Sequence, residues 1–438
     1  MDASTCKEKV YRPRHPEKTT FYSVLFHYFD RFVVEYEERF EKEYGRWRSV
    51  ISETVGKYLD CGNLKRGFAR VRCPGCREEY LLGFSCKAKI CPSCSARRSA
   101  LWADFVSTHV LQASPHAHLV FSVPKMLRIF FRFNRKLLSE LCRCAWKAFR
   151  FYCRQCLGQD VLPAGIFSIQ TAGDSLNWSP HIHALILQGG RRPDGSFQAL
   201  GDIDTAALRQ LFESFLFGML VAKGLIATEL VEKIRSWKHT GFHVYSGPPL
   251  KTTEEIIRVG YYIIRPAASA GRLKADAGVV KYLAKATEAA CYDASLFDPP
   301  GENFDYLDWI ARLTSHIPDR GAQSIHYYGG YSNKHRGCAR KAVALQRPTP
   351  EPSVQTCPDR PTRKQWAVLV KKIYEADPLL CPRCRQKMKI VAVINKHSVI
   401  DKILKHLGYR FEVVPLQPPP TRPPPPFFWS AEDFSSQS

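Results

Sequence analysis

Residues 181–187 read His181-Ile-His183-Ala-Leu-Ile-Leu187, which is a strand pattern that carries two histidines. Successive side chains of a β-strand point to opposite faces of a sheet, so both imidazoles lie on one face while Ile182 faces a core. Two imidazoles at this spacing can hold one metal ion. A strand whose two histidines bind no metal is the commoner explanation of the same pattern. The surrounding residues therefore have to show which explanation applies.

The chain is strongly basic. Its 438 residues are enough for two or three domains, and they include 64 Lys and Arg against 41 Asp and Glu, a formal charge of +23. This excess predicts a polyanionic partner, first of all nucleic acid. An anionic membrane is the competing partner, but no uninterrupted apolar run approaches the roughly 20 residues that span a bilayer. The charged start, Met1 to Lys9, does not resemble a signal peptide and predicts a cytoplasmic protein.

Cysteine spacing predicts a zinc module. In a reducing compartment, the 16 cysteines are expected to be metal ligands or buried thiols rather than disulfides. Two C-x-x-C knuckles are separated by 14 residues, an arrangement in which tight turns present four thiolates to one zinc ion. We therefore expect one structural Zn²⁺ on Cys73, Cys76, Cys91 and Cys94.

Other cysteines have weaker signals. Cys61 and Cys86 lie in the same segment and could replace a ligand or support the site from outside. A third knuckle, Cys381-Pro-Arg-Cys384, has no second C-x-x-C near it in the sequence, so its two cysteines are only candidate zinc ligands. The pair Cys153 and Cys156 falls in an amphipathic helix pattern over residues 137–157, where buried thiols are expected.

Two segments repeat the pattern Ser-Pro-His-x-His, so either histidine pair could be a metal site. The second pair follows Gln170 across a short connection. Antiparallel pairing of the two strands would bring the Gln170 side-chain oxygen to the imidazoles. We therefore assign a divalent metal to His181, His183 and Gln170 as an open site, and we expect His116 and His118 to be ordinary strand residues.

The order of these motifs resembles that of the rolling-circle transposases of the IS91 and ISCR insertion-sequence group, which are HUH single-strand endonucleases. No single motif is decisive, but their combination and order over residues 58–410 are specific. The matching stretches are Asp60–Arg70, Phe84–Cys94, Phe167–Leu185, Gly241–Val244, Tyr262–Pro266, His316–Pro318, Tyr327–Gly330 and Cys381–Cys384.

The resemblance implies a nucleophilic tyrosine on a helix just before an Arg-Pro pair. Tyr262 occupies this position in Tyr262-Ile-Ile-Arg265-Pro266. Some relatives carry a second tyrosine one turn earlier, where this chain has Arg258, so it resembles the single-tyrosine branch. Tyr261 points about 100° away around a helix and is expected to be a packing residue. Tyr282 lies in a strand pattern and is expected to be structural.

The chemistry agrees with these residues. A tyrosine that stays attached to a 5′ phosphate conserves the phosphodiester energy and leaves a 3′-OH, which can later attack the phosphotyrosine and rejoin strands. A divalent ion would stabilise the charge that develops on the phosphoryl oxygens. The resemblance implies Mg²⁺ or Mn²⁺, and two imidazole ligands suit Mn²⁺ at least as well.

The resemblance also implies the architecture, an α+β multidomain chain. We expect helices over residues 21–60, 95–105, 205–223 and 252–264, and strands over 118–123, 165–170 and 181–187. The HUH nuclease domain is expected to be an antiparallel sheet with helices on one face. The expected units are an N-terminal helical segment (1–60), a zinc-binding DNA-recognition module (61–98), the catalytic domain (99–355), an accessory region with a zinc-knuckle-like C-x-x-C (356–412) and a disordered proline-rich tail (413–438).

The expected partner is DNA, both single-stranded and at the element ends, with no membrane and no small-molecule substrate. In a prokaryotic cell this places the protein at the nucleoid. Basic residues among aromatics suit gripping phosphates and stacking unpaired bases. The zinc module either recognises the terminal DNA of the element or only stabilises the fold. The expected DNA contacts are Arg97, Arg98, Arg128, Arg132, Arg135, Lys136 and Arg265.

Two other functions stay open at this point. A plasmid or phage replication initiator or relaxase would use the same chemistry, but it usually brings a helicase or primase segment, and no G-x-x-x-x-G-K-[ST] loop occurs. A non-catalytic zinc DNA-binding protein would explain the charge and the cysteines, but it gives His181, His183 and Tyr262 no purpose. A metal-dependent nicking assay on single-stranded DNA separates this second alternative from an enzyme.

Overall fold

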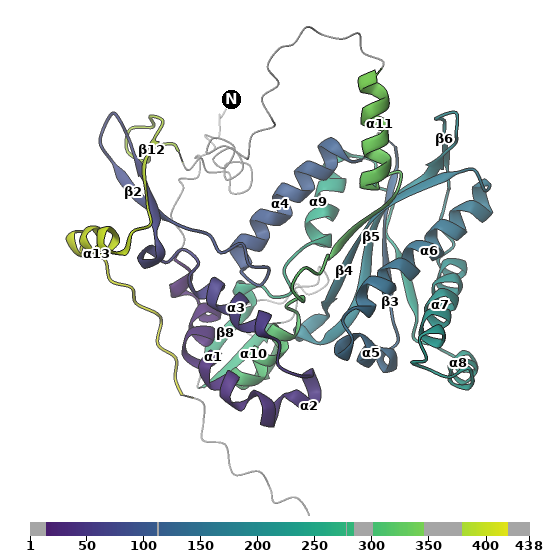
Figure 1. The fold of residues 1–438 in the computed structure, drawn as a ribbon, viewed down its shortest axis with the longest axis horizontal. Coiled ribbons are helices and arrows are strands. Elements are labelled where there is room, and N and C mark those ends of the chain that lie inside the picture. The colour runs from purple at the N-terminus through teal and green to yellow at the C-terminus, as the bar shows by residue number, and fades with distance from the viewer. Residues whose placement is uncertain (1–14, 112–113, 277, 284–300, 346–378, 419–438) are drawn as a thin grey trace, which may run out of the picture.

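The computed structural model describes residues 15–111, 114–276, 278–283, 301–345 and 379–418 (Figure 1). Its largest element is a six-stranded antiparallel sheet in the order β11–β4–β5–β3–β7, with β6 paired to β5. This sheet, together with the helices around it, confirms the predicted α+β class. The strands are β3 (His116–Ser122), β4 (Leu162–Ala172), β5 (Trp178–Arg191), β6 (Phe197–Ala199), β7 (His243–Ser246) and β11 (Ile325–Gly329).

The predicted strands at 118–123, 165–170 and 181–187 are the three central ones of this sheet. β4 and β5 pair in the predicted antiparallel sense, with Gln170 opposite His181 and Ser168 opposite His183. β3 pairs with the other edge of β5 and places Val120 opposite His183. Because paired residues share a face of the sheet, the histidines of β5 and the polar end of β4 lie together.

One face of the sheet packs on α6 (Leu137–Leu157) and α7 (Thr205–Ala222). The apolar residues that alternate with the histidines, Ile182 and Ala184, enter this core, as the strand pattern predicted. α7 is the one helix of the described residues that is long and apolar enough to cross a membrane, and it packs on this core. The same face is extended by η3 (Lys125–Leu127), α5 (Arg128–Phe133) and α8 (Thr228–Arg235).

The face that carries the histidines is also covered by helices, so the expectation of helices on one face only was wrong. α4 (Pro92–His109) and α9 (Thr253–Ile263) lie on this side, opposite α6 and α7 (Figure 1). The physical reason is that this face is polar only at one end. At the other end Ile166, Leu185 and Leu187 are fully buried and need a second apolar layer over them.

A second core lies beside the sheet and crosses the predicted domain boundaries. Phe21 of the N-terminal helices packs edge-on against Trp309, with ring centroids 5.0 Å apart. Residues 273–315, which the prediction placed in the catalytic domain, therefore pack against the N-terminal segment. The elements of this core are η1 (Pro16–Lys18), α1 (Thr20–Arg39), α2 (Glu41–Tyr44), α3 (Ser49–Leu59), η5 (Ala270–Arg272), β8 (Leu273–Asp276), β9 (Val279–Leu283), β10 (Gly301–Phe304) and α10 (Tyr306–Ser315).

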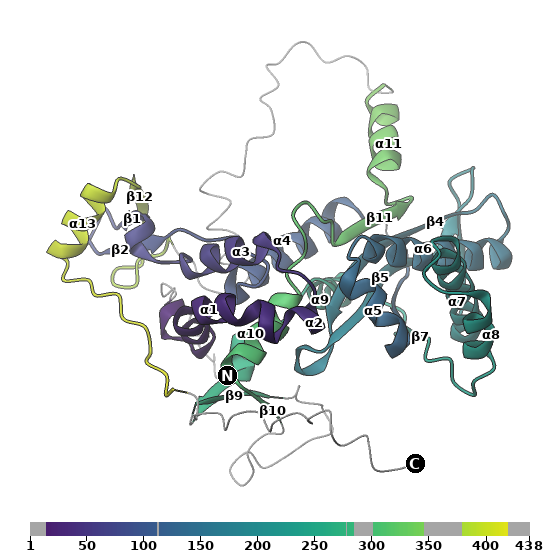
Figure 2. The ribbon, with the colours of Figure 1, turned by 60° about the horizontal axis from the view of Figure 1, so that its bottom comes forward.

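A third unit joins distant parts of the chain. β1 (Phe68–Arg72) is the middle strand of a small sheet, with β2 (Glu79–Gly83) on one side and β12 (Lys389–Ile394) on the other. α13 (His397–His406) and η2 (Leu64–Arg66) pack on it, and both ribbon views place these elements together (Figures 1 and 2). Residues 379–406 were predicted as a separate accessory region, but they share a sheet with the predicted zinc module.

The remaining elements are η4 (Asp174–Leu176) and α11 (Asn333–Leu345). The first residues of the predicted proline-rich tail contact the second core. There the Tyr306 hydroxyl on α10 donates to the carbonyl of Gln417 at 3.0 Å. Residues 419–438 of that tail and residues 356–378 of the predicted accessory region lie outside the described residues.

Candidate active site and zinc centres

His181 and His183 present converging nitrogens. Their Nε2 atoms are 3.1 Å apart. The Nδ1 atom of His181 lies 2.6 Å from the carbonyl oxygen of Ser179, and because a carbonyl can only accept, Nδ1 carries the proton and Nε2 a lone pair. Two adjacent ligands of an octahedral ion with bonds of about 2.1 Å lie about 3.0 Å apart. The pair therefore has the geometry of two ligands of one divalent ion.

His118 of β3 belongs to this site, contrary to the expectation that it is an ordinary strand residue. Its Nε2 atom is 2.9 Å from Nδ1 of His183, and the two rings stack at 5.2 Å. Burial lowers the pKa of His118 to about 4, so its ring is neutral at pH 7. A neutral His118 that accepts from the His183 Nδ1–H places the lone pair of His183 on Nε2, the nitrogen that can bind a metal. His116 instead bonds to the Tyr331 hydroxyl at 2.6 Å.

The signal that could have found His118 was the repeated Ser-Pro-His-x-His pattern. Both copies fall on strands, and β3 pairs directly with β5 in an antiparallel register. This pairing puts the two histidine pairs on the same face of the sheet, which the sequence alone did not reveal.

Gln170 lies opposite His181 and is buried. Its side-chain nitrogen donates to the backbone carbonyl of Ile263 at 2.5 Å, which leaves its oxygen as the atom that can bind a metal. A cavity of about 300 Å³ opens beside it, lined by Gln170, His181, Arg265, Arg272 and Tyr282 among others. The three predicted ligands are thus adjacent, as the strand argument required.

Tyr262 lies over the imidazoles. Its ring centroid is 5.3 Å from that of His183 and 6.0 Å from that of His118, with an interplanar angle of 79° in both cases. The side chain is 44% exposed, so its hydroxyl can meet a substrate. The structure therefore brings the predicted nucleophile to the predicted metal ligands.

Local interactions at both ends fix the helix that carries Tyr262. Thr252 and Glu255 form a capping box at its N-terminus. The carbonyl groups at a helix C-terminus lack intrahelical partners, and here side chains of neighbouring elements supply them. Ser168 of β4 donates to Ile263 at 3.2 Å, and Ser99 of α4 donates to Ile264 at 3.1 Å.

Arg265 follows Tyr262 by less than one turn, and its guanidinium carbon lies 4.1 Å from the centre of the Tyr262 ring. Tyr261 is half-buried, in agreement with a packing role. Tyr282 is 1% exposed on β9, and its hydroxyl accepts from the backbone N–H of Ser269 at 3.2 Å. The predicted strand position of Tyr282 is confirmed.

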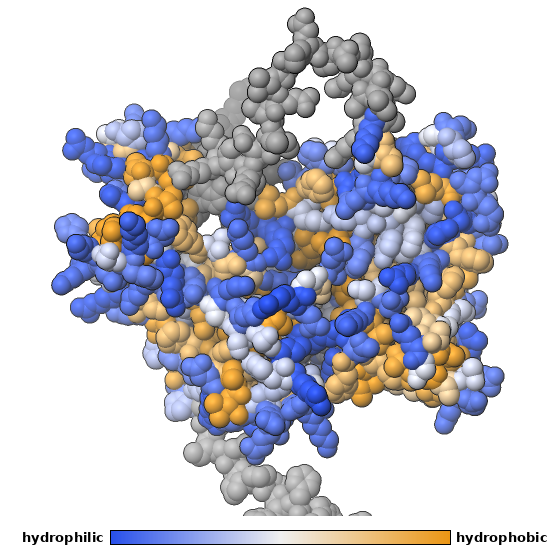
Figure 3. Space-filling model, viewed as in Figure 1, coloured by the Kyte–Doolittle hydropathy of each residue, from blue (hydrophilic) through white to orange (hydrophobic). Residues whose placement is uncertain are grey.

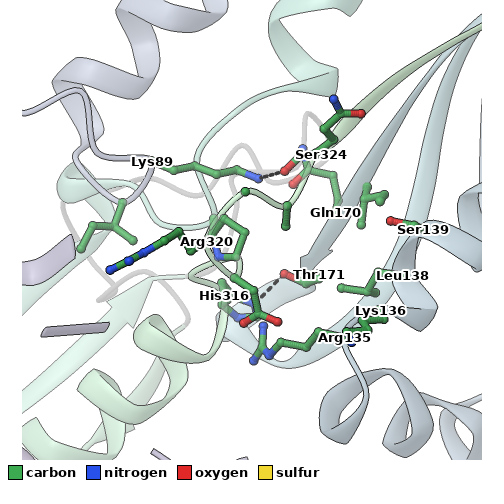
Figure 4. A pocket seen from close by; sticks show the side chains of 18 of the residues that line it. Lys89, Arg135, Lys136, Leu138, Ser139, Gln170, Thr171, His316, Arg320 and Ser324 are labelled. Atoms are coloured by element: carbon green, nitrogen blue, oxygen red, sulfur yellow. Dashed lines mark hydrogen bonds between the residues drawn. The ribbon is translucent and has the colours of Figure 1, made fainter. Parts of the chain in front are cut away.

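A second, larger cavity of about 450 Å³ also has Gln170 in its lining (Figure 4). Lys89, Arg135 and Lys136 contribute its positive charge together with Arg320. Figure 4 shows Lys89 donating to the Ser324 hydroxyl, at 3.0 Å. Burial lowers the pKa of Lys89 to about 8, so the ammonium is mostly charged at pH 7. Sequence reasoning missed Lys89, because no local pattern distinguishes it within the cysteine loop.

The predicted DNA contacts are dispersed, and several of them are engaged within the protein. Arg132 donates to the carbonyl of Glu43 at 3.0 Å, and Arg135 donates to the carbonyl of Ser315 at 2.7 Å. Both arginines therefore join elements of the second core to the large sheet. Arg128 donates to the carbonyl of Val123 at 3.4 Å. Arg98 donates to the carbonyl of Lys87, and Arg265 packs on the Tyr262 ring at the cavity. Arg97 is half-buried on α4, and Lys136 is exposed. Their contacts with DNA stay a prediction.

The cysteines form two clusters instead of the single predicted one. Cys61, Cys86, Cys91 and Cys94 make the first, with neighbouring Sγ atoms 3.7 to 3.8 Å apart. Four sulfurs at about 2.3 Å from a tetrahedral zinc ion are about 3.8 Å apart, so this cluster fits Zn²⁺. Cys61 and Cys86, considered as replacement ligands, complete it.

The prediction that Cys73 and Cys76 share this ion was wrong, since they lie with Cys381 and Cys384 in the second cluster. The physical reason is the β1–β2 hairpin. It carries the Cys73–Cys76 turn away from the first cluster and toward the chain segment that precedes β12.

Hydrophilic residues line the hollows in the centre of the face shown in Figure 3, between the N-terminal helices and the large sheet. The larger cavity is formed by α6, α10, β4 and the loops around them, and it shares Gln170 with the smaller cavity. The basic side chains in its lining suit an anionic substrate.

Comparisons with known proteins match the chain to transposases. Residues 29–123 match the family model of a transposase zinc-binding domain, and residues 165–340 match that of a putative transposase. The chain is 27% identical over 376 residues to the transposase for insertion sequence element IS801 of Pseudomonas savastanoi pv. phaseolicola, covering 82% of this chain and 87% of that protein. It is 24% identical over 348 residues to the putative transposase y4qJ of Sinorhizobium fredii, covering 74% and 84%. No solved structure matches the chain.

Proposed function

Because the chain belongs to the IS91 family of transposases, which act on DNA, we propose that it cuts one DNA strand with Tyr262 as the nucleophile. The observation that carries this proposal is the position of the Tyr262 ring, 5.3 Å from His183, on a helix end that Gln170 holds. A structural tyrosine would not need such an exposed position beside two converging imidazoles.

The residues present fit a divalent ion. Two imidazole nitrogens 3.1 Å apart and the Gln170 oxygen are three neutral donors on one face, which leaves positions open for phosphate oxygens and water. Mg²⁺ and Mn²⁺ both suit this donor set. When bound, the ion would withdraw charge from the phosphoryl oxygens of the scissile phosphate.

Cleavage then follows from the residues of the chain. The Tyr262 oxygen attacks the phosphorus and forms a P–O bond, while the bond from phosphorus to the 3′ oxygen breaks. The phenol loses its proton and the departing 3′ oxygen gains one, leaving a 5′-phosphotyrosine and a 3′-OH. Attack by a 3′-OH reverses the step and transfers the strand without an external energy source, as rolling-circle transposition requires.

Arg265 supports both directions of this reaction. Its guanidinium packs on the Tyr262 ring at 4.1 Å and orients the phenol. It also lines the smaller cavity, where it lies close to the phosphate that Tyr262 would carry. The larger cavity shares Gln170 with the smaller one and adds the cations Lys89, Lys136 and Arg320. We propose that an unpaired strand at the element end runs along these two cavities, in a protein that meets its DNA at the prokaryotic nucleoid.

The test is a nicking assay on an oligonucleotide from the element end, labelled at its 3′ end so that the label lies downstream of the cut. The wild-type protein with Mn²⁺ is expected to give a labelled covalent adduct on a denaturing gel, and EDTA is expected to abolish it. Tyr262→Phe keeps the ring and should form no adduct, whereas the matched control Tyr261→Phe should form it normally.

His181→Ala and His183→Ala should also lose cleavage while keeping single-strand binding. Peptide mapping of the adduct to Tyr261 or Tyr282, or cleavage that persists in Tyr262→Phe, would overturn the assignment of the nucleophile. A protein that binds DNA but never cleaves it under these conditions would be a non-catalytic zinc protein.

A further inference from the structure

We propose that Cys73, Cys76, Cys381 and Cys384 bind a second Zn²⁺, which joins residues 64–83 and 379–406 into one zinc ribbon. The Sγ atoms of Cys73 and Cys384 are 3.4 Å apart, as are those of Cys76 and Cys381, and all four lie within 4.8 Å of one another. The site goes beyond the matched family models, because Cys381 and Cys384 fall outside residues 29–123 and 165–340.

The two turns that carry these cysteines have the same backbone conformation. The N–H of Cys73 donates to the carbonyl of Glu78 at 2.8 Å, and the N–H of Cys381 donates to that of Gln386 at 2.9 Å, five residues on in both cases. The residue after each second cysteine, Arg77 or Arg385, has a φ of 61°. A positive φ is costly for a residue with a side chain, so finding it twice at equivalent places indicates two matched metal knuckles.

Strand pairing brings the two knuckles to one end of the small sheet. The first knuckle directly follows β1, and the second precedes β12. The antiparallel register places Arg72, the last residue of β1, opposite Lys389, the first residue of β12. The knuckles also touch, since a Cβ atom at Gly75 would overlap the Gln386 side chain. The four thiols are therefore positioned by backbone pairing between segments 311 residues apart in the sequence.

The ribbon has only a small apolar core, made of the residues around the cysteines and a second cluster of Phe68 on β1 with Ile400 and Leu404 on α13. Around the cysteines, the fully buried side chains other than the thiols are only Val71 and Met388. On β12, Val391 and Val393 remain 53% and 48% exposed, over the strand where Figure 3 shows an orange patch. A small unit buries only a modest share of the surface that its unfolded chain exposes, so its stability is marginal without further support. Four thiolates in two knuckles select Zn²⁺, which would supply the missing stability.

One consequence concerns the organisation of the chain. With this ion bound, residues 379–406 belong to the zinc-binding part of the protein, and the nuclease sheet lies between its two halves in the sequence. This inference does not depend on the proposed nuclease chemistry, because the ion lies in a separate sheet from Tyr262 and the histidines.

The first test counts zinc in the purified full-length chain by elemental analysis. We expect two Zn²⁺ per wild-type chain and one in each of two variants, Cys73→Ser/Cys76→Ser and Cys381→Ser/Cys384→Ser. The matched control, Cys156→Ser/Cys338→Ser, changes two exposed cysteines outside both clusters and should keep two. One zinc per wild-type chain, or two in the Cys381→Ser/Cys384→Ser variant, would overturn the proposal.

The second test asks whether the ion ties the segments together. Hydrogen exchange of the backbone amides should be slow in β12 of the wild-type chain and fast in Cys73→Ser/Cys76→Ser, although the changed residues are far away in the sequence. The amides of β4 and β5 should be protected equally in both proteins, which shows that the variant is folded. Unchanged protection of β12 in this variant would overturn the proposal.

Discussion

Gln170 of β4 donates a hydrogen bond from its side-chain nitrogen to the carbonyl oxygen of Ile263 at 2.5 Å. Ile263 is the residue directly after Tyr262. The same carbonyl accepts from the Ser168 hydroxyl at 3.2 Å. Both donors lie on the strand opposite the two histidines. The helix end that carries the proposed nucleophile is therefore held by the strand that carries a proposed metal ligand, and a change in one moves the other.

Gln170→Glu should separate these two roles. A carboxylate keeps an oxygen for the metal, but it cannot donate to Ile263 and repels its carbonyl. We expect Mn²⁺ binding to be kept and the single-turnover nicking rate to fall about 10- to 100-fold, as for other changes that disturb ligand orientation. The control Ser168→Ala removes the weaker donor to the same carbonyl and should cost less. Unchanged nicking in Gln170→Glu would show that the contact does not position Tyr262.

His118→Gln should weaken metal binding. The His118 Nε2 lies 2.9 Å from the His183 Nδ1 and so fixes which nitrogen of His183 carries the lone pair. We expect the Mn²⁺ affinity, measured by calorimetry, to fall about 10- to 100-fold, and excess Mn²⁺ to restore part of the nicking. His335→Gln, an exposed histidine on α11, is the control and should bind normally. Equal Mn²⁺ affinity in both variants would return His118 to the role of an ordinary strand residue.

Arg265→Ala should slow the chemical step more than it weakens DNA binding. The guanidinium packs on the Tyr262 ring and supplies positive charge where the phosphate arrives. Loss of one such group typically costs about a hundredfold in rate, and we expect the affinity for single-stranded DNA to fall by less. Arg258→Ala removes an exposed arginine one turn before Tyr262 and should have little effect on either. Similar losses in both variants would indicate a general charge effect.

His316 should make the protein sensitive to acid. It is 6% exposed, and burial lowers its pKa from 6.5 to about 3. The folded state binds the proton less readily than the unfolded state, so this contribution to stability is complete above pH 6.5 and is lost as the pH falls toward 3. Between pH 7 and pH 5 the loss is about 2 kcal/mol in the free energy of unfolding.

His316→Gln removes the titrating ring, so the difference between urea unfolding at pH 7 and pH 5 should shrink by this amount. His335→Gln keeps His316 and should behave as the wild type does. The same acid-induced loss in all three proteins would assign it to other groups.

The ribbon should contact duplex DNA. Residues 64–83 and 379–410 contain 13 Lys and Arg but only three Asp and Glu, a net +10 of the chain's +23. Arg72 and Lys389 are exposed and lie opposite each other at the end of β1 and β12. In Arg72→Ala/Lys389→Ala, the slope of log K for an element-end duplex against log salt should fall by about 1.8, since each phosphate contact contributes about 0.9. The control Lys147→Ala/Arg150→Ala removes equal charge from α6, and an equal change there would exclude a local contact.

The sequence by itself determined the local structure of the strands and the helix that carry the proposed site. Alternation in residues 181–187 placed both histidines on one face of a strand, because the side-chain period of a strand is two wherever the strand lies. Gln170 could be paired with them because a short connection between two strands favours antiparallel pairing. The Tyr262 helix could be predicted because its periodicity and its Arg-Pro end are local features.

Only the tertiary structure decided which distant elements share a core or a metal. The sequence of a C-x-x-C turn does not show with which second turn it shares a metal ion. The sequence therefore could not show that Cys73 and Cys76 belong to a different cluster from Cys91 and Cys94. Their true partners follow from the pairing of β1 with β12, two strands more than 300 residues apart. His118 joined the site for the same reason, since the register of β3 on β5 is set by burial of the whole sheet. The helices over both faces and the core shared by Phe21 and Trp309 likewise depend on how apolar surfaces meet in space, which no local pattern encodes.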